Sequence, residues 1–197
     1  MLSGRIVLAS ANPGKLQELA TLLAPLGLSV LAQTSLGVES AEETGDSFAA
    51  NALLKARHAS LITGLPALAD DSGIEVDALE GRPGVWSARY AGERASDAEN
   101  LNKLLHELHA VPAERRTARY QCVVALVRTA SDPQPLLAHG TWEGFIVTAP
   151  RGEGGFGYDP IFQPRGCDCT AAQLTARQKN AVSHRAQALR ELAKQLS

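Results

Sequence analysis

The chain has few of the features that mark secreted, membrane or nucleic-acid-binding proteins. Its 197 residues include only three cysteines, and an odd, sparse set argues against a disulfide-rich secreted domain. No apolar run approaches the roughly 20 residues of a membrane helix, and the apolar segment 6–9 is too short for a secretory signal. A net charge of −2 provides no general attraction for nucleic acids or anionic membranes. We therefore expect a cytoplasmic protein without a nucleic-acid or membrane partner.

The length and composition that remain are those of an ordinary globular protein. Hydrophobic residues make up 45% of the chain and charged residues 20%, and the length suits one large domain or two small lobes. Helix and strand patterns mix without strict alternation, which predicts an α/β fold with a mixed sheet and flanking helices. Strands are predicted at 6–9, 74–78, 120–127 and 136–147, and a further strand at the short apolar run that begins at Leu68. Helices are predicted at 13–27, where Gly27 ends the helix, at 48–60, at 96–108 and at the C-terminus.

Two adjacent carboxylates, Asp70 and Asp71, follow the apolar run and precede Ser72 and Gly73. The run is expected to end at these residues. Neighbouring like charges repel, which favours a bound cation or a positioned substrate; the alternative is a solvated turn. If the backbone stays extended, the two side chains face opposite sides. Only one of the two carboxylates can then face a ligand.

The start of the first predicted helix has the character of a phosphate site. It reads Ser10-Ala11-Asn12-Pro13-Gly14-Lys15, with Asn12 suited to cap the helix and Pro13 to its first position. A helix N-terminus presents free N–H groups and a partial positive charge, and Lys15 in the first turn makes sense if an anion binds there. The segment is not a Walker A loop. The alternative is a capped helix with an exposed lysine.

Basic residues recur at the start of the last helix. Ser183 is a suitable cap, His184 and Arg185 follow it, and Lys179 lies just upstream. Cations again stand where the helix dipole prefers acids, which favours a second anion-binding patch over ordinary surface basics.

Glu42 and Glu43 precede the helix predicted at 48–60. They are either acids that complement its dipole or carboxylates that share Mg²⁺ with Asp71. The sequence leaves open which of the two glutamates binds the metal.

A glycine-rich stretch runs through Phe156, Gly157, Tyr158 and Asp159. Glycine lets a ligand approach the backbone, Phe156 offers a face on which a base can stack, and Asp159 is able to accept from a ring N–H. The alternative is a tight loop in which Phe156 fills the core.

The cysteines have no place in these motifs. Cys122 lies in a strand-like run and is interpreted as a core residue. Cys167-Asp168-Cys169 is a pattern able to bind a metal or respond to oxidants, but no second Cys/His pair supports a metal site.

Taken in order, these motifs resemble the signatures of the inosine/xanthosine triphosphate pyrophosphatases. The matching segments are Ser10-x-Asn12-x-x-Lys15, Ala69-Asp70-Asp71-Ser72-Gly73, Gly81-x-Pro83-Gly84-x-x-Ser87-Ala88-Arg89-Tyr90, Phe156-Gly157-Tyr158-Asp159-Pro160 and Ser183-His184-Arg185-x-x-Ala188-Leu189. The resemblance covers nearly the whole chain. It implies a single domain of this family over residues 1–197, with a two-lobed α/β fold, a long central mixed sheet flanked by helices, an active-site cleft between the lobes, and a homodimer.

The resemblance also implies a reaction: Mg²⁺-dependent hydrolysis of ITP, dITP and XTP to the monophosphate and pyrophosphate. Asp71 would be the general base or a metal ligand. The resemblance therefore picks Asp71 as the aspartate that faces the phosphates, and Asp70 is expected to orient the turn or to support the site from behind. The substrate-binding residues would be Ser10, Ala11, Asn12, Pro13, Gly14 and Lys15 for the phosphates, Ser72 for the nucleotide, and Phe156, Gly157, Tyr158, Asp159, Lys179, His184 and Arg185 for the base and sugar. We expect Arg185 to donate to the purine 6-oxygen. Two alternatives are a nucleotide-binding sensor without turnover and a related pyrophosphatase acting on pyrimidine or other modified nucleotides.

Overall fold

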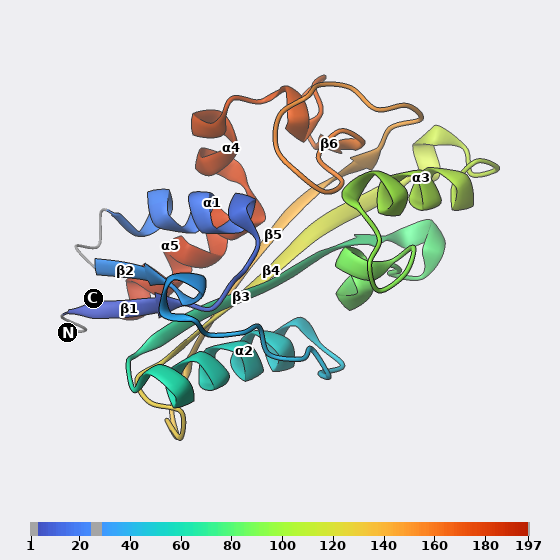
Figure 1. Ribbon diagram of the computed structural model, residues 1–197. Helices are drawn as coiled ribbons and strands as arrows, with labels where there is room; N and C mark the ends of the chain where they lie inside the picture. The colour runs from blue at the N-terminus through green and yellow to red at the C-terminus, as the bar shows by residue number, and fades with distance from the viewer. Residues whose placement is uncertain (1–3, 25–28, 197) are drawn as a thin grey trace. The chain divides into compact units, whose positions relative to one another are not determined.

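The computed structural model describes residues 4–24 and 29–196, and the helix end predicted at Gly27 lies outside them. The chain forms two compact units (Figure 1). Unit 1 comprises Met1–Asp71, Cys122–Gly140 and His184–Ser197, and unit 2 comprises Ser72–Gln121 and Thr141–Ser183. The prediction of one domain over residues 1–197 stays a prediction.

Six strands form a mixed sheet in the order β2-β1-β3-β4-β5-β6. The strands are β1 (Arg5–Leu8), β2 (Ser29–Ala32), β3 (Ala67–Val76), β4 (Thr117–Val127), β5 (Leu136–Ile146) and β6 (Phe162–Pro164). Strand β1 runs parallel to β2 and β3, whereas β5 and β6 are antiparallel. The predicted α/β class with a mixed sheet is confirmed.

Five α-helices accompany the sheet in the described part of the chain: α1 (Pro13–Leu23), α2 (Phe48–Thr63), α3 (Asp97–Glu107), α4 (Ala176–Val182) and α5 (His184–Leu196). Short 3₁₀ helices are η2 (Gln33–Leu36), η3 (Asp77–Leu79), η4 (Gly84–Arg89), η5 (Ala113–Arg115) and η6 (Ala171–Gln173). None of the helices in residues 4–24 and 29–196 has the length and hydropathy to cross a bilayer.

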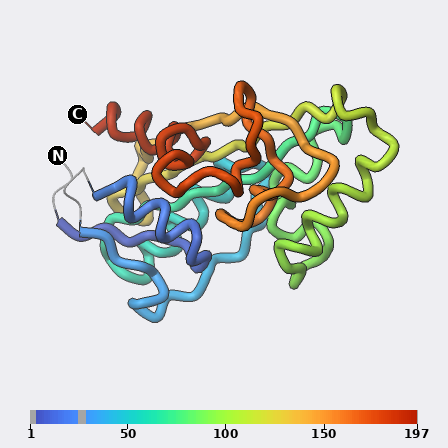
Figure 2. Tube along the Cα trace, turned by 90° about the horizontal axis from the view of Figure 1, so that it is seen from above, coloured from blue at the N-terminus to red at the C-terminus, as the bar shows by residue number. Residues whose placement is uncertain are grey.

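The strands of unit 1 bury alternate residues on opposite faces, as the two-residue period of a strand requires. Helices α1 and α5 cover one face and α2 covers the other (Figure 1), and α1 and α5 lie side by side (Figure 2). The first face buries Ile6, Leu8, Leu68, Cys122, Val124 and Leu126. The second buries Val7, Ala9, Ala67, Ala69, Val123 and Ala125.

Unit 2 has its own core. Tyr120, Trp142 and Phe162 form an aromatic cluster, with 4.7 Å between the Tyr120 and Phe162 ring centroids. Leu101 and Leu104 of α3 pack into the same core, and a capping box of Ser96 and Glu99 begins that helix.

One sequence expectation about the acidic pair is wrong. The apolar run does not end at Asp70 and Asp71, because β3 continues without interruption to Val76. A continuous strand is possible because each carboxylate meets cations on its own side, as described below. Three short elements, β2, β6 and α4, had no prediction.

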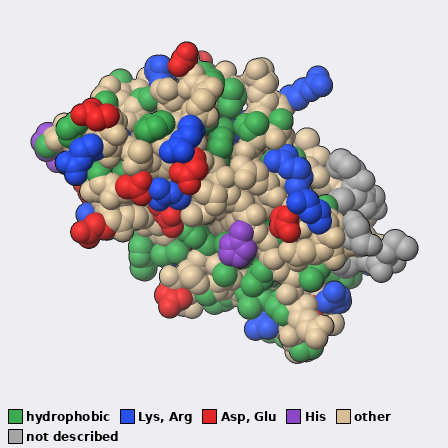
Figure 3. Space-filling model, turned by 180° about the vertical axis from the view of Figure 1, so that it is seen from behind, with side chains coloured by type: hydrophobic (Ala, Val, Ile, Leu, Met, Phe, Trp, Pro, Cys, Tyr) green, Lys and Arg blue, Asp and Glu red, His purple; other side chains and the backbone are tan. Residues whose placement is uncertain are grey.

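Charged side chains of both signs are interspersed over the face drawn in Figure 3, in keeping with the net charge of −2. An anion-binding site must therefore come from a local arrangement of residues.

Candidate active site

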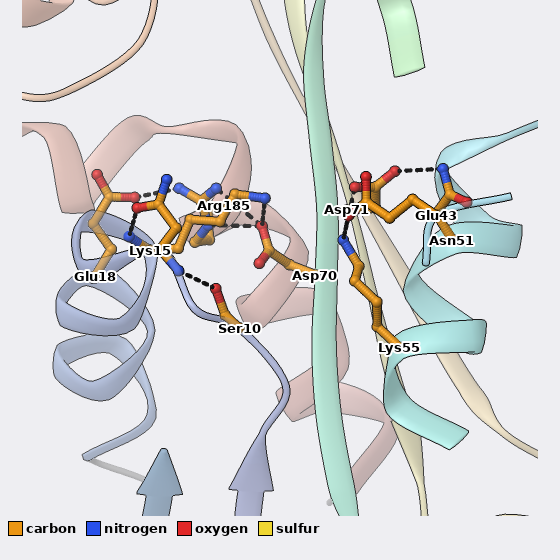
Figure 4. A network of polar contacts seen from close by, with 10 residues as sticks. Ser10, Lys15, Glu18, Glu43, Asn51, Lys55, Asp70, Asp71 and Arg185 are labelled. Atoms are coloured by element: carbon orange, nitrogen blue, oxygen red, sulfur yellow. Dashed lines mark hydrogen bonds and ion pairs between the residues drawn. The ribbon is translucent and has the colours of Figure 1, made fainter. Parts of the chain in front are cut away.

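The acidic pair of β3 serves two separate sets of contacts in unit 1. Asp70 points toward α1 and α5, and Asp71 points toward α2 on the other side of the strand (Figure 4). The expectation that the two side chains face opposite sides is confirmed. The two aspartates continue the alternation of the core residues before them, since Leu68 faces α1 and α5 while Ala69 faces α2.

Asp70 is a buried anion held by two cations. It is 1% exposed, its Oδ2 lies 3.3 Å from Lys15 Nζ, and Arg185 donates to that oxygen at 3.1 Å from Nε and 3.0 Å from Nη2. Arg185 also contacts Glu18 of α1. Burial by itself raises the pKa of Asp70, but Lys15 and Arg185 outweigh it and hold that pKa far below its usual range. Asp70 therefore stays ionised and ties α1 and α5 to the strand.

Asp71 has a different set of partners, all from the α2 side. Lys55 Nζ lies 2.9 Å from its Oδ1, and the Asn51 amide donates to Oδ2 at 3.3 Å. The same lysine lies 2.6 Å from Glu43 Oε1. Lys55 therefore joins Glu43 and Asp71 into one cluster.

The pKa values of Asp71 and Lys55 are both shifted in this cluster. Burial raises the pKa of Asp71 above its ordinary value and outweighs the opposing charge of Lys55. Burial lowers the pKa of Lys55, but Asp71 and Glu43 reverse the effect, so the net pKa is raised and the ammonium persists at neutral pH. A carboxylate with a raised pKa is a better proton acceptor than an ordinary surface aspartate.

The N-terminus of α1 completes the unit 1 site. Asn12 Oδ1 accepts from the Lys15 N–H at 3.0 Å, Ser10 Oγ accepts from the Asn12 N–H at 3.2 Å, and Pro13 occupies the first position. The first turn contains no acidic residue, and Ala11, Asn12 and Pro13 are exposed. The predicted cap is confirmed, and the segment is open to an anion.

The metal prediction depends on the two glutamates, which differ. Glu43 is half-buried and shares Lys55 with Asp71, whereas Glu42 is exposed. No group of three or more His, Cys, Asp or Glu side chains able to hold a metal occurs in residues 4–24 and 29–196. Mg²⁺ needs only one or two protein carboxylates when substrate phosphates supply further oxygens, so the pair Glu43 and Asp71 fits that ion.

The glycine-rich stretch of unit 2 is organised by Asp159. This 1% exposed carboxylate accepts from Lys179 Nζ at 2.5 Å, from the Phe156 N–H at 2.9 Å and from the Tyr120 hydroxyl at 3.3 Å. Lys179 Nζ also lies 4.6 Å from the centroid of the Phe156 ring. Nearby, Asp97 Oδ2 accepts from the Gly157 N–H at 2.7 Å.

The remaining predicted residues have these positions. Tyr158 is buried and donates to the Ser87 carbonyl at 2.8 Å, Ser72 is half-buried in β3, and His184 is the buried first residue of α5. The roles of these residues in substrate binding, like those of Asp159 and Arg185, stay predictions.

Sequence reasoning missed Asn51 and Lys55. They stand four residues apart in α2 and therefore lie on one helix face. Asn51 is fully buried, and its Oδ1 also accepts from the Gly45 N–H at 2.8 Å. The signal that could have identified them is an Asn and a Lys four residues apart in an alanine-rich helix that follows Glu43.

The geometry can be compared with that of known proteins. The Ham1 family model matches residues 6–195. The chain is 59% identical to the dITP/XTP pyrophosphatase of Photorhabdus laumondii and 61% identical to that of Yersinia pseudotuberculosis, in each case over 94% of both chains.

Solved structures agree with this match. A HAM1 protein from Coxiella burnetii has a TM-score of 0.90 and 50% identity over 98% of both chains. The nucleoside-triphosphatase / dITP/XTP pyrophosphatase of Mycobacterium abscessus has a TM-score of 0.75 and 47% identity over 95% of this chain and 98% of that one. Sequence and fold agree over nearly the whole length, and the chain therefore belongs to the Ham1 family.

Proposed function

We propose that this protein hydrolyses non-standard purine nucleoside triphosphates, dITP, ITP and XTP, to the monophosphate and pyrophosphate. The observation that carries the proposal is the cluster of Glu43, Lys55 and Asp71, in which the Lys55 ammonium lies 2.6 Å from Glu43 Oε1 and 2.9 Å from Asp71 Oδ1. The relatives at 59% and 61% identity are named dITP/XTP pyrophosphatases, which supports the choice of substrate.

The triphosphate is assigned to the N-terminus of α1. The positive end of the α1 dipole and the Lys15 ammonium provide positive charge, and the first turn contains no acidic residue. These groups are set in place before the substrate arrives, so they stabilise charge that develops on the phosphates during the reaction. The residues assigned to this step are Ser10, Ala11, Asn12, Pro13, Gly14 and Lys15.

Mg²⁺ is assigned to Glu43 and Asp71, with Glu42 left outside because it is exposed. When bound, the ion supplies neutralisation of phosphate charge. Lys55 holds both carboxylates in one place before the metal and substrate bind.

Asp71 is assigned the role of general base. One of its oxygens accepts a proton from the water that attacks the α-phosphorus. Asn51 holds the other oxygen at 3.3 Å and keeps the carboxylate oriented. Pyrophosphate is the leaving group, so ³¹P NMR of the reaction should show pyrophosphate and no orthophosphate as the primary product.

The base and sugar are assigned to Ser72, Phe156, Gly157, Tyr158, Asp159, Lys179, His184 and Arg185. A hydrogen-bond donor that faces the purine 6-position favours hypoxanthine and xanthine, whose 6-carbonyl accepts from it. The 6-amino group of adenine is itself a donor and would leave the protein donor without an acceptor. Such polar contacts discriminate by roughly 10⁴ or more. Asp159 keeps Phe156 and Lys179 in position through the contacts described above.

A substrate panel with pyrophosphate detection tests the proposal. We expect ITP, dITP and XTP to be hydrolysed with kcat/KM far above those for ATP, GTP, dUTP and dCTP. Preferred hydrolysis of a pyrimidine nucleotide would move the protein to a different substrate class, and binding of ITP without release of pyrophosphate would make it a sensor.

We also propose a cytoplasmic homodimer, on the strength of the family resemblance. Sedimentation velocity at micromolar concentration should give the mass of two chains.

A further inference from the structure

The two cysteines of the Cys167-Asp168-Cys169 segment form a disulfide, with their Cα atoms 5.3 Å apart. The segment lies on the surface loop of unit 2 between β6 and η6, and both cysteines are half-buried. Neither the catalytic cluster nor the phosphate site uses them. The bond therefore needs its own explanation.

Stabilisation of the folded chain is a weak explanation. A disulfide stabilises mainly by closing a loop of the unfolded chain, and its effect grows with loop length. This bond joins residues only two positions apart. Disulfides of proteins from reducing compartments are usually catalytic or redox-sensing, and solvent-accessible ones exchange most easily.

The disulfide is connected on both sides to Arg151, which begins the glycine segment (residues 151–157). The Cys167 carbonyl accepts from Gln163 Nε2 at 2.9 Å, and Gln163 Oε1 accepts from Arg151 Nη2 at 2.7 Å. On the other side, Thr170 directly follows Cys169 and donates from Oγ1 to the Arg151 carbonyl at 2.6 Å.

Helix η6, which starts after Thr170, supports the glycine segment directly. Thr170 forms a capping box with Gln173 at the start of this helix. The Ala172 carbonyl accepts from the Gly154 N–H at 3.0 Å, and the Ala172 N–H donates to the Asp159 carbonyl at 3.1 Å.

The packing of the glycine segment against Ala172 leaves no space to spare. A Cβ on Gly152 would lie 2.7 Å from the Ala172 carbonyl carbon, and one on Gly154 would lie 2.8 Å from its oxygen. A shift of Thr170 or η6 is therefore transmitted to residues 151–159. These residues include the aromatic ring and the carboxylate assigned to the base.

We propose that Cys167 and Cys169 form a thiol–disulfide exchange site whose oxidation state controls the order of the glycine segment and, through it, the affinity for the nucleotide. The second half of this inference rests on the proposed function. Arg151 Nη1 lies 3.4 Å from the Asp168 carbonyl, and a nearby cation favours the thiolate that exchange requires. Cys122 takes no part, because burial raises the pKa of its thiol to about 12.

The exchange balances with a dithiol as reductant. One thiolate of the reductant attacks a cysteine Sγ, the Cys167–Cys169 bond breaks, and the released thiolate takes a proton from solvent. The second thiol of the reductant then attacks the mixed disulfide, frees the other cysteine and leaves the reductant as a disulfide. The protein gains two electrons and two protons in total. A low-molecular-weight disulfide such as oxidised glutathione reverses the reaction.

The test uses the full-length protein equilibrated in glutathione buffers from oxidising to reducing, with free thiols trapped by iodoacetamide. Intact mass should show two more alkylated cysteines in the reduced form than in the oxidised form. Hydrogen-exchange mass spectrometry should show faster exchange of the amides in residues 151–159 after reduction, because the Gly154 N–H loses a fixed partner. Absence of the disulfide throughout the series, or identical exchange in both forms, would overturn the proposal.

Kinetics with dITP test the link to the nucleotide. Reduction should raise KM by about fivefold or more, a typical coupling between sites, with little change in kcat. The variant Cys167→Ser/Cys169→Ser should behave as the reduced form in every buffer, and Cys122→Ala, the matched control, should respond as the wild type. An unchanged KM would refute the link. Because thiol trapping and hydrogen exchange need no turnover, failure of the proposed reaction would remain distinguishable from failure of the redox site.

Discussion

Asp70 and Asp71 are adjacent in sequence, yet the structure predicts opposite outcomes for the same isosteric substitution. Asp70→Asn removes a buried charge from Lys15 and Arg185, while Asp71→Asn removes a charge that burial already disfavours. The first variant should lose stability, and the second should lose turnover. The contrast tests whether the pair divides its work between fold and chemistry.

The loss of stability expected for Asp70→Asn follows from the contacts of Asp70. Breaking a buried ion pair leaves an uncompensated charge and typically costs about 3–5 kcal/mol. Lys15 is only partly buried, but the Arg185 side chain is 1% exposed and would lose its ion pair with Asp70 while it keeps its contact with Glu18. The expected loss is a large part of a total stability that is usually about 5–15 kcal/mol.

The change in the free energy of unfolding expected for Asp71→Asn is smaller than that expected for Asp70→Asn. Its raised pKa means that the folded protein holds the carboxylate less favourably than the unfolded chain does at neutral pH. Lys55 retains Glu43 after the substitution. We expect Asp71→Asn to change the free energy of unfolding by about 1 kcal/mol or less while kcat falls by orders of magnitude.

Urea unfolding followed by circular dichroism measures the first quantity, and pyrophosphate release from dITP measures the second. The two variants control for each other, because each converts a carboxylate into the isosteric amide at neighbouring positions of the same strand. Equal unfolding midpoints at equal slopes would refute the ion-pair argument. Wild-type turnover of Asp71→Asn would remove Asp71 from the chemistry.

Three further predictions concern Gly140, Asn51 and the metal. Gly140→Ala should destabilise unit 1 by about 3 kcal/mol or more, seen as a lower unfolding midpoint, because the added Cβ would lie 2.0 Å from the His184 carbonyl oxygen and 2.5 Å from the Ala188 nitrogen; an unchanged midpoint would contradict the close packing. Asn51→Ala should lower kcat for dITP and cost about 1–3 kcal/mol of stability, because Asp71 loses a buried donor; kinetics equal to wild type would show that the orientation of the carboxylate is irrelevant. Chelation with EDTA should abolish pyrophosphate release and Mg²⁺ should restore it, whereas activity in full chelation would reject the metal assignment.

Several local features could be read from the sequence because nearest neighbours decide them. The cap at Asn12 and the proline after it specify where α1 begins, and both lie within one helical turn. The two-residue period of a strand was enough to place Asp70 and Asp71 on opposite sides. The family motifs added the reaction, since they occur in order along the chain.

Other features depend on residues that are far apart in sequence. The end of the apolar run was mispredicted because local propensity favours a turn at Asp, Ser and Gly. The strand continues because Arg185, 115 positions away, neutralises Asp70 from one side, and Lys55 reaches Asp71 from the other.

The sequence by itself thus determined the helix start at Asn12, the opposite orientation of the two aspartates and the family. Only the tertiary structure decided which cations the two aspartates meet, and that Lys55 joins Asp71 to Glu43 rather than to Glu42. It also decided that Cys167 and Cys169 form a disulfide close to helix η6, which packs against the glycine segment. The physical reason is that caps and strand periods are set by neighbouring residues, whereas ion pairs and burial arise only when distant segments pack together.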